Sequence, residues 1–178
     1  SRTAGSTHAW RIEASGDVIS APEPAAVAAG SIVEASDLYF NTPARRKFLR
    51  SPQTEYAHSE ENFKRLALSR PDVRFLLTHN GRAQWHLPAA GAQERIRAVL
   101  GDEFTAASLP VDVASAGLRL HGLAAQPTYS RGSRDAQYFF VNGRFVRDKM
   151  LAHAVREAYQ DVLHHDRHSA YVLFLELN

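Results

Sequence analysis

The sequence predicts an α+β protein built from two sheets, each covered by helices on one side. Two observations predict this class. Short apolar strand-like runs alternate along the chain with amphipathic helical runs, and the Asn-Gly pairs at 80–81 and 142–143 each separate two strand-like segments. The 178 residues are enough for one large domain or two small ones with a buried core. We expect the boundary near residue 100, which gives domains over 1–100 and 101–178.

The first half of the chain alternates strands and helices. Its expected elements are a strand over 9–14, a surface connection over 20–29, a strand over 30–40, a helix over about 51–70, a hairpin over 73–87 and a helix over 92–100. Pro52 suits a first helical turn, and Pro71 stops the helix. Tyr56, Phe63, Leu66 and Ala67 form its apolar stripe. Gly101 is the expected cap of the second helix.

The second half follows the same pattern. We expect a hairpin over 109–124 that turns near 115–117, a loop over 126–135, a hairpin over 136–147, a helix after the capping residue Asp148, and a buried strand over 171–177. The apolar face of that helix is expected to comprise Leu151, Ala154, Val155, Ala158 and Val162. Local turn and cap signals therefore set most of these boundaries.

Composition limits the classes of function. The net charge is only +2, so affinity for a polyanion must come from local clusters of Arg and Lys. There are no cysteines, which excludes disulfides and thiolate metal sites and agrees with a reducing cytoplasm. No apolar run approaches the roughly 20 residues of a membrane span, and no signal peptide is visible. We expect a cytoplasmic protein without a membrane partner. The chain begins without Met, so we expect it to be an excerpt of a longer protein.

Residues 37–49 form the most informative stretch, Asp-Leu-Tyr-Phe-Asn-Thr-Pro-Ala-Arg-Arg-Lys-Phe-Leu. An apolar strand end breaks at a proline turn, and a dense basic cluster follows. This string closely resembles the signature of the MutL family of DNA mismatch-repair proteins, which belong to the GHKL ATPase superfamily. Residues 137–149, Gln-Tyr-Phe-Phe-Val-Asn-Gly-Arg-Phe-Val-Arg-Asp-Lys, resemble a second signature of that family. The resemblance runs over essentially the whole chain.

The resemblance implies a fold with two domains and a separate role for each. Residues 1–100 would be the C-terminal part of a GHKL ATPase α/β sandwich. Residues 101–178 would be a domain similar to the second domain of ribosomal protein S5, incomplete at its C-terminal end, which carries nucleotide state to partners. In the family, ATP closes two N-terminal regions into a homodimer around DNA. The dimer passes the mismatch signal from a MutS-type recognition protein to a downstream endonuclease and a helicase.

The parts that hydrolyse ATP in the family are not found here. The family's catalytic Glu, metal-binding Asn, adenine-reading Asp-Gly segment and glycine-rich lid all precede the point that matches Ser1, and a γ-phosphate lysine follows the last strand. We therefore assign no catalytic residue, expect ATP and Mg only in the full-length protein, and expect the chain to be inactive alone. Ser31, after Gly30, aligns with a family Gly-Thr pair at the adenine end of the pocket and is the one candidate nucleotide contact.

Two basic clusters are candidate sites. The first, Asn41, Thr42, Arg45, Arg46 and Lys47 with nearby Arg50, is by resemblance a nucleotide-lid or dimer loop, or a contact to DNA phosphate. Alternatively its arginines pair with Glu55, Glu60 or Glu61. The second is Arg144, Arg147 and Lys149, with Arg131 and Arg134 nearby in sequence. A tight turn would hold Arg144 out to meet phosphate without reading bases. Alternatively, these residues belong to an ordinary solvent-exposed turn without a binding role.

Other interpretations remain open at this point. His164, His165, Asp166 and His168 have metal-binding side chains, but consecutive residues that close a helix seldom converge on one ion, so we predict no metal site. The chain could also be a piece of a gyrase-B-type or Hsp90-type GHKL protein. A third alternative is a free-standing S5-like module that binds RNA or the ribosome, and this one predicts a preference for RNA over DNA.

Overall fold

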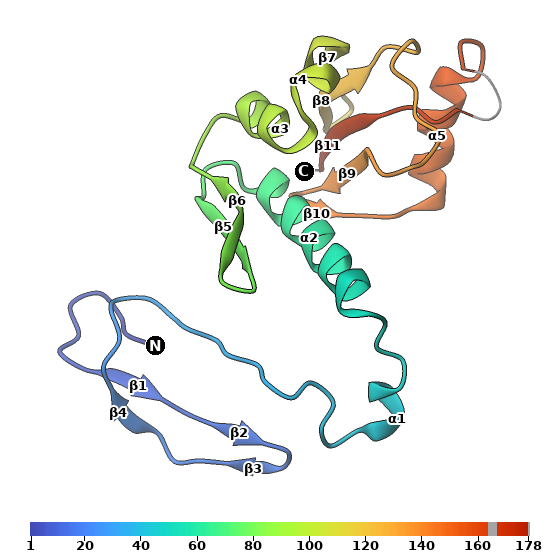
Figure 1. Cartoon of the computed structure of the whole chain (residues 1–178). Helices are drawn as coiled ribbons and strands as arrows, with labels where there is room; N and C mark the ends of the chain where they lie inside the picture. Colours follow the sequence, from blue (N-terminus) through green and yellow to red (C-terminus); the bar gives the residue numbers. More distant parts are fainter. Residues whose placement is uncertain (164–166, 178) are drawn as a thin grey trace. The chain divides into compact units, whose positions relative to one another are not determined.

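The computed structural model describes residues 1–163 and 167–177. They form two compact units, Ser1–Ser51 and Pro52–Asn178, whose elements are labelled in Figure 1. These units are defined by contacts within the chain. The boundary expected near residue 100 instead separates the part that resembles a GHKL ATPase domain from the part that resembles the S5 domain. That boundary stays a prediction.

The first unit consists of short antiparallel pairs. Strand β1 (Ala9–Arg11) pairs with β4 (Glu23–Ala25), and β2 (Ala14–Ser15) pairs with β3 (Val18–Ile19). The turn between β2 and β3 contains Gly16 at φ 62°. The surface connection expected over 20–29 is wrong in part, because β4 lies inside it.

The strand expected over 30–40 is wrong. Only Gly30 makes a β-bridge, to Arg2, and among the described residues no strand lies between β4 and α1 (Pro43–Arg46). Asp37 and Tyr39 adopt positive φ angles of 47° and 64°, which interrupt an extended backbone. The apolar pattern is present, but a strand also needs a neighbour to accept its hydrogen bonds, and within the described structure only Gly30 of this segment has one.

The second unit begins with a helix, a hairpin and two further helices. Its first elements are α2 (Pro52–Ser69), β5 (Phe75–His79), β6 (Arg82–Leu87), α3 (Ala92–Leu100) and α4 (Asp102–Ala106). The hairpin turn is confirmed, with Asn80 at φ 48° and Gly81 at φ 76°. Helix α3 has the predicted bounds, and the N–H of Gly101 donates to the Arg97 carbonyl. Helix α4 was not predicted.

Helix α2 packs on two sides, which corrects its predicted apolar stripe. Phe63 and Ala67 pack with Leu87 of the hairpin, whereas Leu68 points into a second cluster. Leu66, expected on the buried stripe, is 60% exposed. A helix wedged between a hairpin and a sheet buries two adjacent faces, so one stripe at helical spacing does not describe it.

A five-stranded sheet completes the second unit, with the order β10-β9-β11-β8-β7. Its elements in chain order are β7 (Ser108–Ser115), β8 (Leu118–Ala125), β9 (Gln137–Val141), β10 (Arg144–Phe145), α5 (Lys149–Tyr159) and β11 (Tyr171–Leu177). Strand β11 is parallel to β9, and the other neighbours are antiparallel. Both predicted hairpins and the loop between them are confirmed. The final strand is buried only over Tyr171–Leu173.

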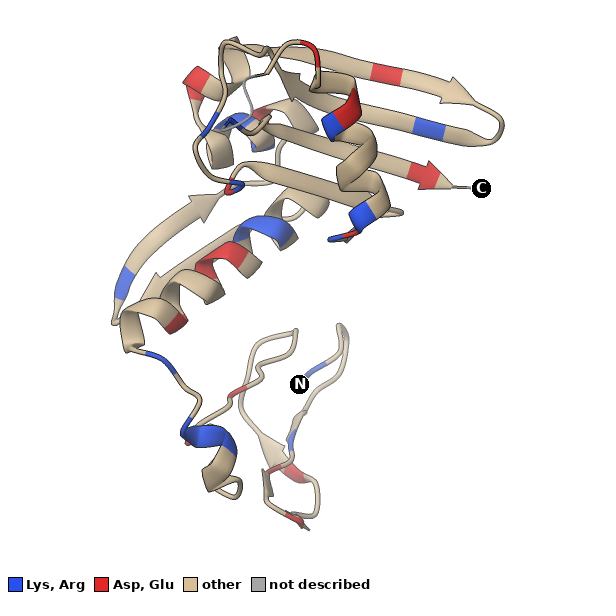
Figure 2. Ribbon diagram, turned by 90° about the vertical axis from the view of Figure 1, so that its right-hand side faces the viewer, with Lys and Arg blue, Asp and Glu red and all other residues tan. Residues whose placement is uncertain are grey.

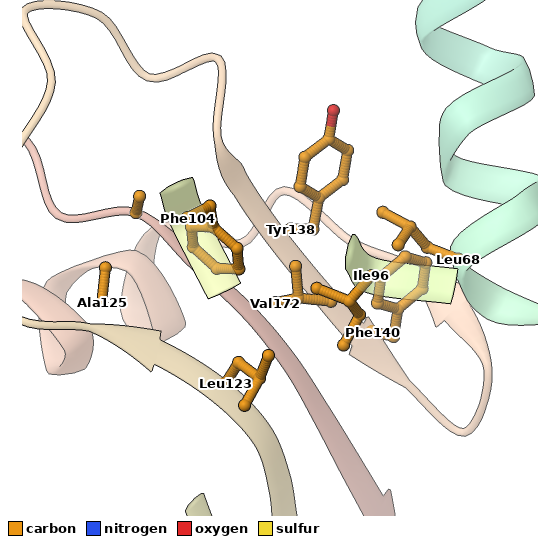
Figure 3. Packing of buried hydrophobic residues seen from close by; sticks show 9 residues of the cluster. Leu68, Ile96, Phe104, Leu123, Ala125, Tyr138, Phe140 and Val172 are labelled. Carbon is orange, nitrogen blue, oxygen red and sulfur yellow. The ribbon is translucent and has the colours of Figure 1, made fainter. Parts of the chain in front are cut away.

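Helices cover both faces of this sheet. On one face the cluster in Figure 3 joins the sheet to α2, α3 and α4; its members are Leu68, Ile96, Phe104, Leu123, Ala125, Tyr138, Phe140, Ala170 and Val172. On the other face Phe139, Tyr171 and Leu173 pack with Leu151 and Val155 of α5. The predicted one-sided cover is therefore wrong, because α4 covers the face opposite α5 even when α2 and α3 are counted with the preceding domain. Of the expected α5 face, Ala154 and Ala158 are exposed and Val162 lies beyond the helix.

Arg95 is a buried cation at the centre of the α2–α3 region. Its side chain is 1% exposed and donates hydrogen bonds to the carbonyl oxygens of Ala67 (2.8 Å), Pro71 (3.1 Å), Val73 (2.8 Å) and Pro88 (2.6 Å). Burial lowers the pKa of this guanidinium, and the charge of Asp72 acts in the opposite direction. Arg95 therefore ties the end of α2, the following turn and the end of β6 to α3.

Candidate nucleic-acid interface

The corner between β10 and α5 presents the predicted basic residues on a short, well-held segment. Arg144 begins β10, where it pairs with Val141, and Arg147 and Lys149 follow at the start of α5. All three are exposed, and the basic ribbon at this corner is visible in Figure 2. The structure therefore brings Arg144, Arg147 and Lys149 to one corner of the second unit; we call these three residues the basic corner.

Asn142 holds the turn of this hairpin. With φ 47° at Asn142 and 76° at Gly143, the pair forms the expected two-residue turn. The Asn142 backbone N–H donates to the Leu175 carbonyl at 2.9 Å, and its side-chain oxygen accepts from the Leu177 N–H at 2.8 Å. The side-chain nitrogen donates to the Leu177 carbonyl at 3.3 Å. Arg144 thus stands beside a turn that is tied to the central strand of the sheet.

Asp148 fixes the other side of the corner. Its carboxylate accepts hydrogen bonds from the backbone N–H groups of Met150 (2.9 Å) and Leu151 (3.0 Å), which confirms it as the N-cap of α5. The one carboxylate between Arg147 and Lys149 is therefore engaged with the helix backbone. The corner keeps a positive surface even though an acidic residue lies within it.

Phe145 organises cations beneath the corner. The guanidinium of Arg147 lies 5.9 Å from the centre of the Phe145 ring, and that of Arg65, from α2, lies 4.2 Å from it. Arg65 also pairs with Glu61 at 3.0 Å, so its charge is largely compensated. The sequence gives no local signal for this contact, because Arg65 lies eighty positions before Phe145. Arg65 supports the corner through packing, and Arg147 keeps its charge available.

Arg131 and Arg134 do not join the basic corner. They precede β9, whereas Arg144 follows it, so the length of β9 separates them, about 16 Å at ~3.3 Å per residue. The backbone of Arg131 is bonded to His168, and its side chain stacks on Tyr129 at 4.9 Å. Nearness in sequence was misleading here, because β9 separates the two groups and places them at its opposite ends.

The first basic cluster belongs to the other compact unit. Arg45 and Arg46 lie in the last turn of α1, Lys47 follows, and all three are exposed. Asn41 is exposed and Thr42 is half-buried; the Thr42 carbonyl accepts from the N–H groups of Arg45 (2.9 Å) and Arg46 (3.1 Å). The loop is a compact turn with its cations outward, and its role in closure over nucleotide stays a prediction.

Two of the carboxylates proposed as alternative partners for that loop are engaged elsewhere. Glu60 accepts hydrogen bonds from the Tyr56 hydroxyl (3.1 Å) and the Trp85 indole (2.6 Å). Glu61 binds Arg65 and accepts from the Tyr138 hydroxyl at 3.1 Å. Burial, together with the charge of Glu61 and this hydrogen bond, raises the pKa of Tyr138. Glu60 and Glu61 therefore serve the second unit.

Neither Ser31, the predicted nucleotide contact, nor the histidine cluster forms a binding site among the described residues. Ser31 is exposed and follows Gly30, which carries the single bridge to Arg2, so its role stays a prediction. Across residues 1–163 and 167–177, no group of three or more His, Cys, Asp or Glu side chains could hold a metal ion. His164, His165 and Asp166 lie outside the described residues. No helix in the described part of the chain is long and apolar enough to cross a membrane.

Comparisons with known proteins agree on one family. A family model described as "DNA mismatch repair protein, C-terminal domain" matches residues 96–178. The MutL protein of Thiobacillus denitrificans is 52% identical over 177 residues, which is 99% of this chain and 30% of that protein. The MutL protein of Herminiimonas arsenicoxydans is 54% identical over 180 residues, 100% of this chain and 29% of that protein. The chain belongs to the MutL family.

Solved structures place this MutL segment within a larger domain. The Aquifex aeolicus MutL ATPase domain complexed with ADP superposes with a TM-score of 0.73 at 27% identity, over 96% of this chain and 62% of that one. The α+β fold expected from the sequence, a GHKL-type region followed by an S5-like sheet, is therefore confirmed. The chain spans about 30% of the length of the curated MutL relatives. The relatives named above are MutL proteins and not gyrase-B-type, Hsp90-type or ribosome-binding proteins.

Proposed function

We propose that this MutL segment supplies the full-length repair protein with a DNA contact through its basic corner. The observation that carries the proposal is the exposure of Arg144, Arg147 and Lys149 on a turn and a helix start that are each held by hydrogen bonds. A rigid support lowers the entropy lost when arginine and lysine side chains meet phosphates. Such contacts position DNA and carry no sequence information. They suit a protein that must act wherever a mismatch occurs.

The rest of the proposal concerns the whole protein. It acts in the bacterial cytoplasm as an ATP-dependent matchmaker between a MutS-type mismatch recognition protein and the downstream endonuclease and helicase, and it forms a homodimer when ATP binds. The solved relative bound to ADP supports a nucleotide site in the family. Most groups that hold ATP and Mg belong to segments of the full-length protein outside this chain, and Ser31 adds a contact at the adenine end of the nucleotide. The loop of Asn41, Thr42, Arg45, Arg46 and Lys47 contributes to the nucleotide lid or to the dimer contact.

The test reverses charge at one of two similar turns. Arg144 follows Asn142-Gly143, and the exposed Arg82 follows Asn80-Gly81 at the tip of the β5–β6 hairpin. Arg144→Glu and Arg82→Glu therefore make the same change in net charge on the same type of turn. We expect only Arg144→Glu to weaken binding of the chain to DNA, equally for unrelated sequences, as measured by fluorescence anisotropy across a salt series.

The salt series gives the magnitude. Losing one phosphate contact makes the slope of log K against log salt shallower by about 0.9 for duplex DNA and 0.7 for single strands. Arg45→Glu, in the loop assigned to nucleotide closure, should leave DNA binding by this chain nearly intact. Equal losses for Arg144→Glu and Arg82→Glu would show that the basic corner has no special role. A loss confined to Arg45→Glu would show that the two clusters are assigned the wrong way round.

A further inference from the structure

A second basic site lies at the opposite end of α5. A cavity of about 380 Å³ is bounded by α5, by the start of β9 and by the start of β11. Helix α5 is about 16 Å long at ~1.5 Å per residue, and Lys149 of the basic corner stands at its other end. The cavity therefore belongs to a surface that the basic corner does not include.

Three arginines from separate segments line this cavity. Arg134 comes from the loop before β9, Arg156 from α5, and Arg167 from the segment before β11. None of the three forms an ion pair with a residue that the structure describes. Arginine side chains without carboxylate partners are groups that proteins use to bind phosphate.

Hydrogen bonds hold part of this lining in place. The Nε of Arg167 donates to the Ser130 hydroxyl at 2.9 Å, and its Nη2 donates to the Ser130 carbonyl, which leaves Nη1 for another acceptor. Gln137 is fixed by a bond from its side-chain nitrogen to the Ser169 carbonyl at 2.9 Å. Arg167 and Gln137 are thus positioned before any ligand binds.

The Tyr171 hydroxyl adds a possible donor to the lining. Tyr171, at the start of β11, is only 4% exposed as a residue and lines the cavity. Burial raises the pKa of this phenol, and the charge of Arg134 acts to lower it, so the two groups lie within electrostatic reach. A neutral O–H donor beside unpaired guanidinium groups matches the acceptor-rich surface of a phosphate.

The balance of charge selects the kind of phosphate. Among the described residues, Glu157 is the one carboxylate that lines the cavity, and its Oε1 lies 3.8 Å from the Nδ1 of His153. Within this described lining, three guanidinium groups against one carboxylate leave two positive charges. A phosphate monoester carries about −1.5 to −2 at pH 7, whereas each diester of a nucleic-acid backbone carries one negative charge.

We propose that this cavity binds a phosphate monoester, either the 5′-phosphate of a DNA strand end or the phosphate of a free mononucleotide. Arg134, Arg156 and Arg167 bind the phosphate oxygens, and Tyr171 donates its hydroxyl. The strand-end form rests on the proposed DNA binding. The mononucleotide form does not.

The experiment compares two labelled single-stranded oligonucleotides that differ only in a 5′-phosphate or a 5′-hydroxyl. We expect the 178-residue chain to bind the phosphorylated strand at least about tenfold more tightly, the equivalent of one charge-assisted hydrogen bond. The double variant Arg134→Gln/Arg156→Gln and the single variant Tyr171→Phe should reduce that preference toward unity. Because the readout is a ratio, neither general DNA affinity nor the fraction of folded protein changes it.

Matched controls separate the cavity from its surroundings. Tyr159→Phe removes a hydroxyl from the same lining, but this hydroxyl donates to the Ala125 carbonyl at 2.7 Å, so the preference should persist. Arg144→Gln should lower affinity for both strands alike. Equal binding of the two strands by the parent chain would refute the strand-end form, and a preference that survives in the double variant would refute the cavity as its cause.

Adenosine monophosphate distinguishes the two sources. If it abolishes the 5′-phosphate preference and raises the melting temperature of the parent chain but not of the double variant, the cavity takes free mononucleotides. If it does neither while the preference holds, the source is the strand end. If no oligonucleotide binds at any salt concentration, the proposed DNA contact fails, and the melting test alone decides the cavity. Failure of both the preference and the melting test overturns the proposal.

Discussion

Replacing Arg95 with methionine tests whether one buried cation holds the α2–α3 region together. Methionine keeps most of the apolar stem but removes all four hydrogen bonds to the carbonyls of Ala67, Pro71, Val73 and Pro88. A buried acceptor that loses its partner costs about 1–3 kcal/mol. Four carbonyls at about 1 kcal/mol each give a cost of about 4 kcal/mol. This cost is partly offset, because the variant no longer pays the desolvation free energy of a buried guanidinium. We expect a loss of about 3–4 kcal/mol.

Urea denaturation followed by tryptophan fluorescence measures this loss. Trp85 reports on the second unit, since its indole donates to Glu60, and a Trp10→Phe background removes the other tryptophan. With a slope of about 2 kcal/mol/M, the midpoint should fall by roughly 1.5–2 M. Arg97→Met is the matched control on the same helix. Arg97 is 63% exposed and makes a surface pair with Asp102 at 3.2 Å, so its loss should stay within about 0.5 kcal/mol. Similar midpoints for the two variants would refute the reasoning.

Three further outcomes follow from individual contacts. Asp148→Ala removes the cap of α5 and should cost about 1 kcal/mol of unfolding free energy in urea, whereas no loss would contradict the two capping bonds. Burial and Glu61 raise the pKa of Tyr138 in the folded protein above its unfolded value near 10.0. The stability that the protonated phenol contributes should therefore be present below pH 10 and lost as the pH rises further. Tyr138→Phe should flatten this alkaline decline in the free energy of unfolding, measured at several pH values. Gly122→Ala should prevent the five-stranded sheet from folding, as measured by circular dichroism. Gly122 has φ +136°, and a Cβ added there would lie 2.1 Å from the Val172 carbonyl oxygen. A native spectrum would show that the two strands can separate at this point.

Local signals explain what the sequence predicted well. Asn80-Gly81 and Asn142-Gly143 each need positive φ angles that these residues adopt cheaply, so both hairpins were placed correctly. Asp148 satisfies N–H groups two and three residues away, which makes a helix start visible in a short window. The exposure of Arg144 follows from the same turn. At these three positions the boundary is decided within a few residues, and the sequence was sufficient.

Long-range pairing explains what the sequence could not predict. Residues 30–40 have the composition of a strand, but a strand forms only beside a neighbour, and composition does not say whether one is present. Arg95 reads as a solvated helix residue, because the four carbonyls that bury it lie 7 to 28 positions away. The three arginines that line the cavity at the end of α5 come from separate segments. A search along the sequence groups only residues that are neighbours in the chain, so it does not bring these three together.

The place of β11 in the sheet has a consequence for the order of folding during synthesis. This strand is the last to be made, yet it lies in the middle, and the β7–β8 and β9–β10 hairpins are joined only through it. A ribosome adds about 5–20 residues per second, so the two hairpins wait for several seconds without their shared neighbour. Their inner strands, β8 and β9, expose unpaired backbone groups during that interval. The sheet then closes in one late step, when residues 171–177 emerge.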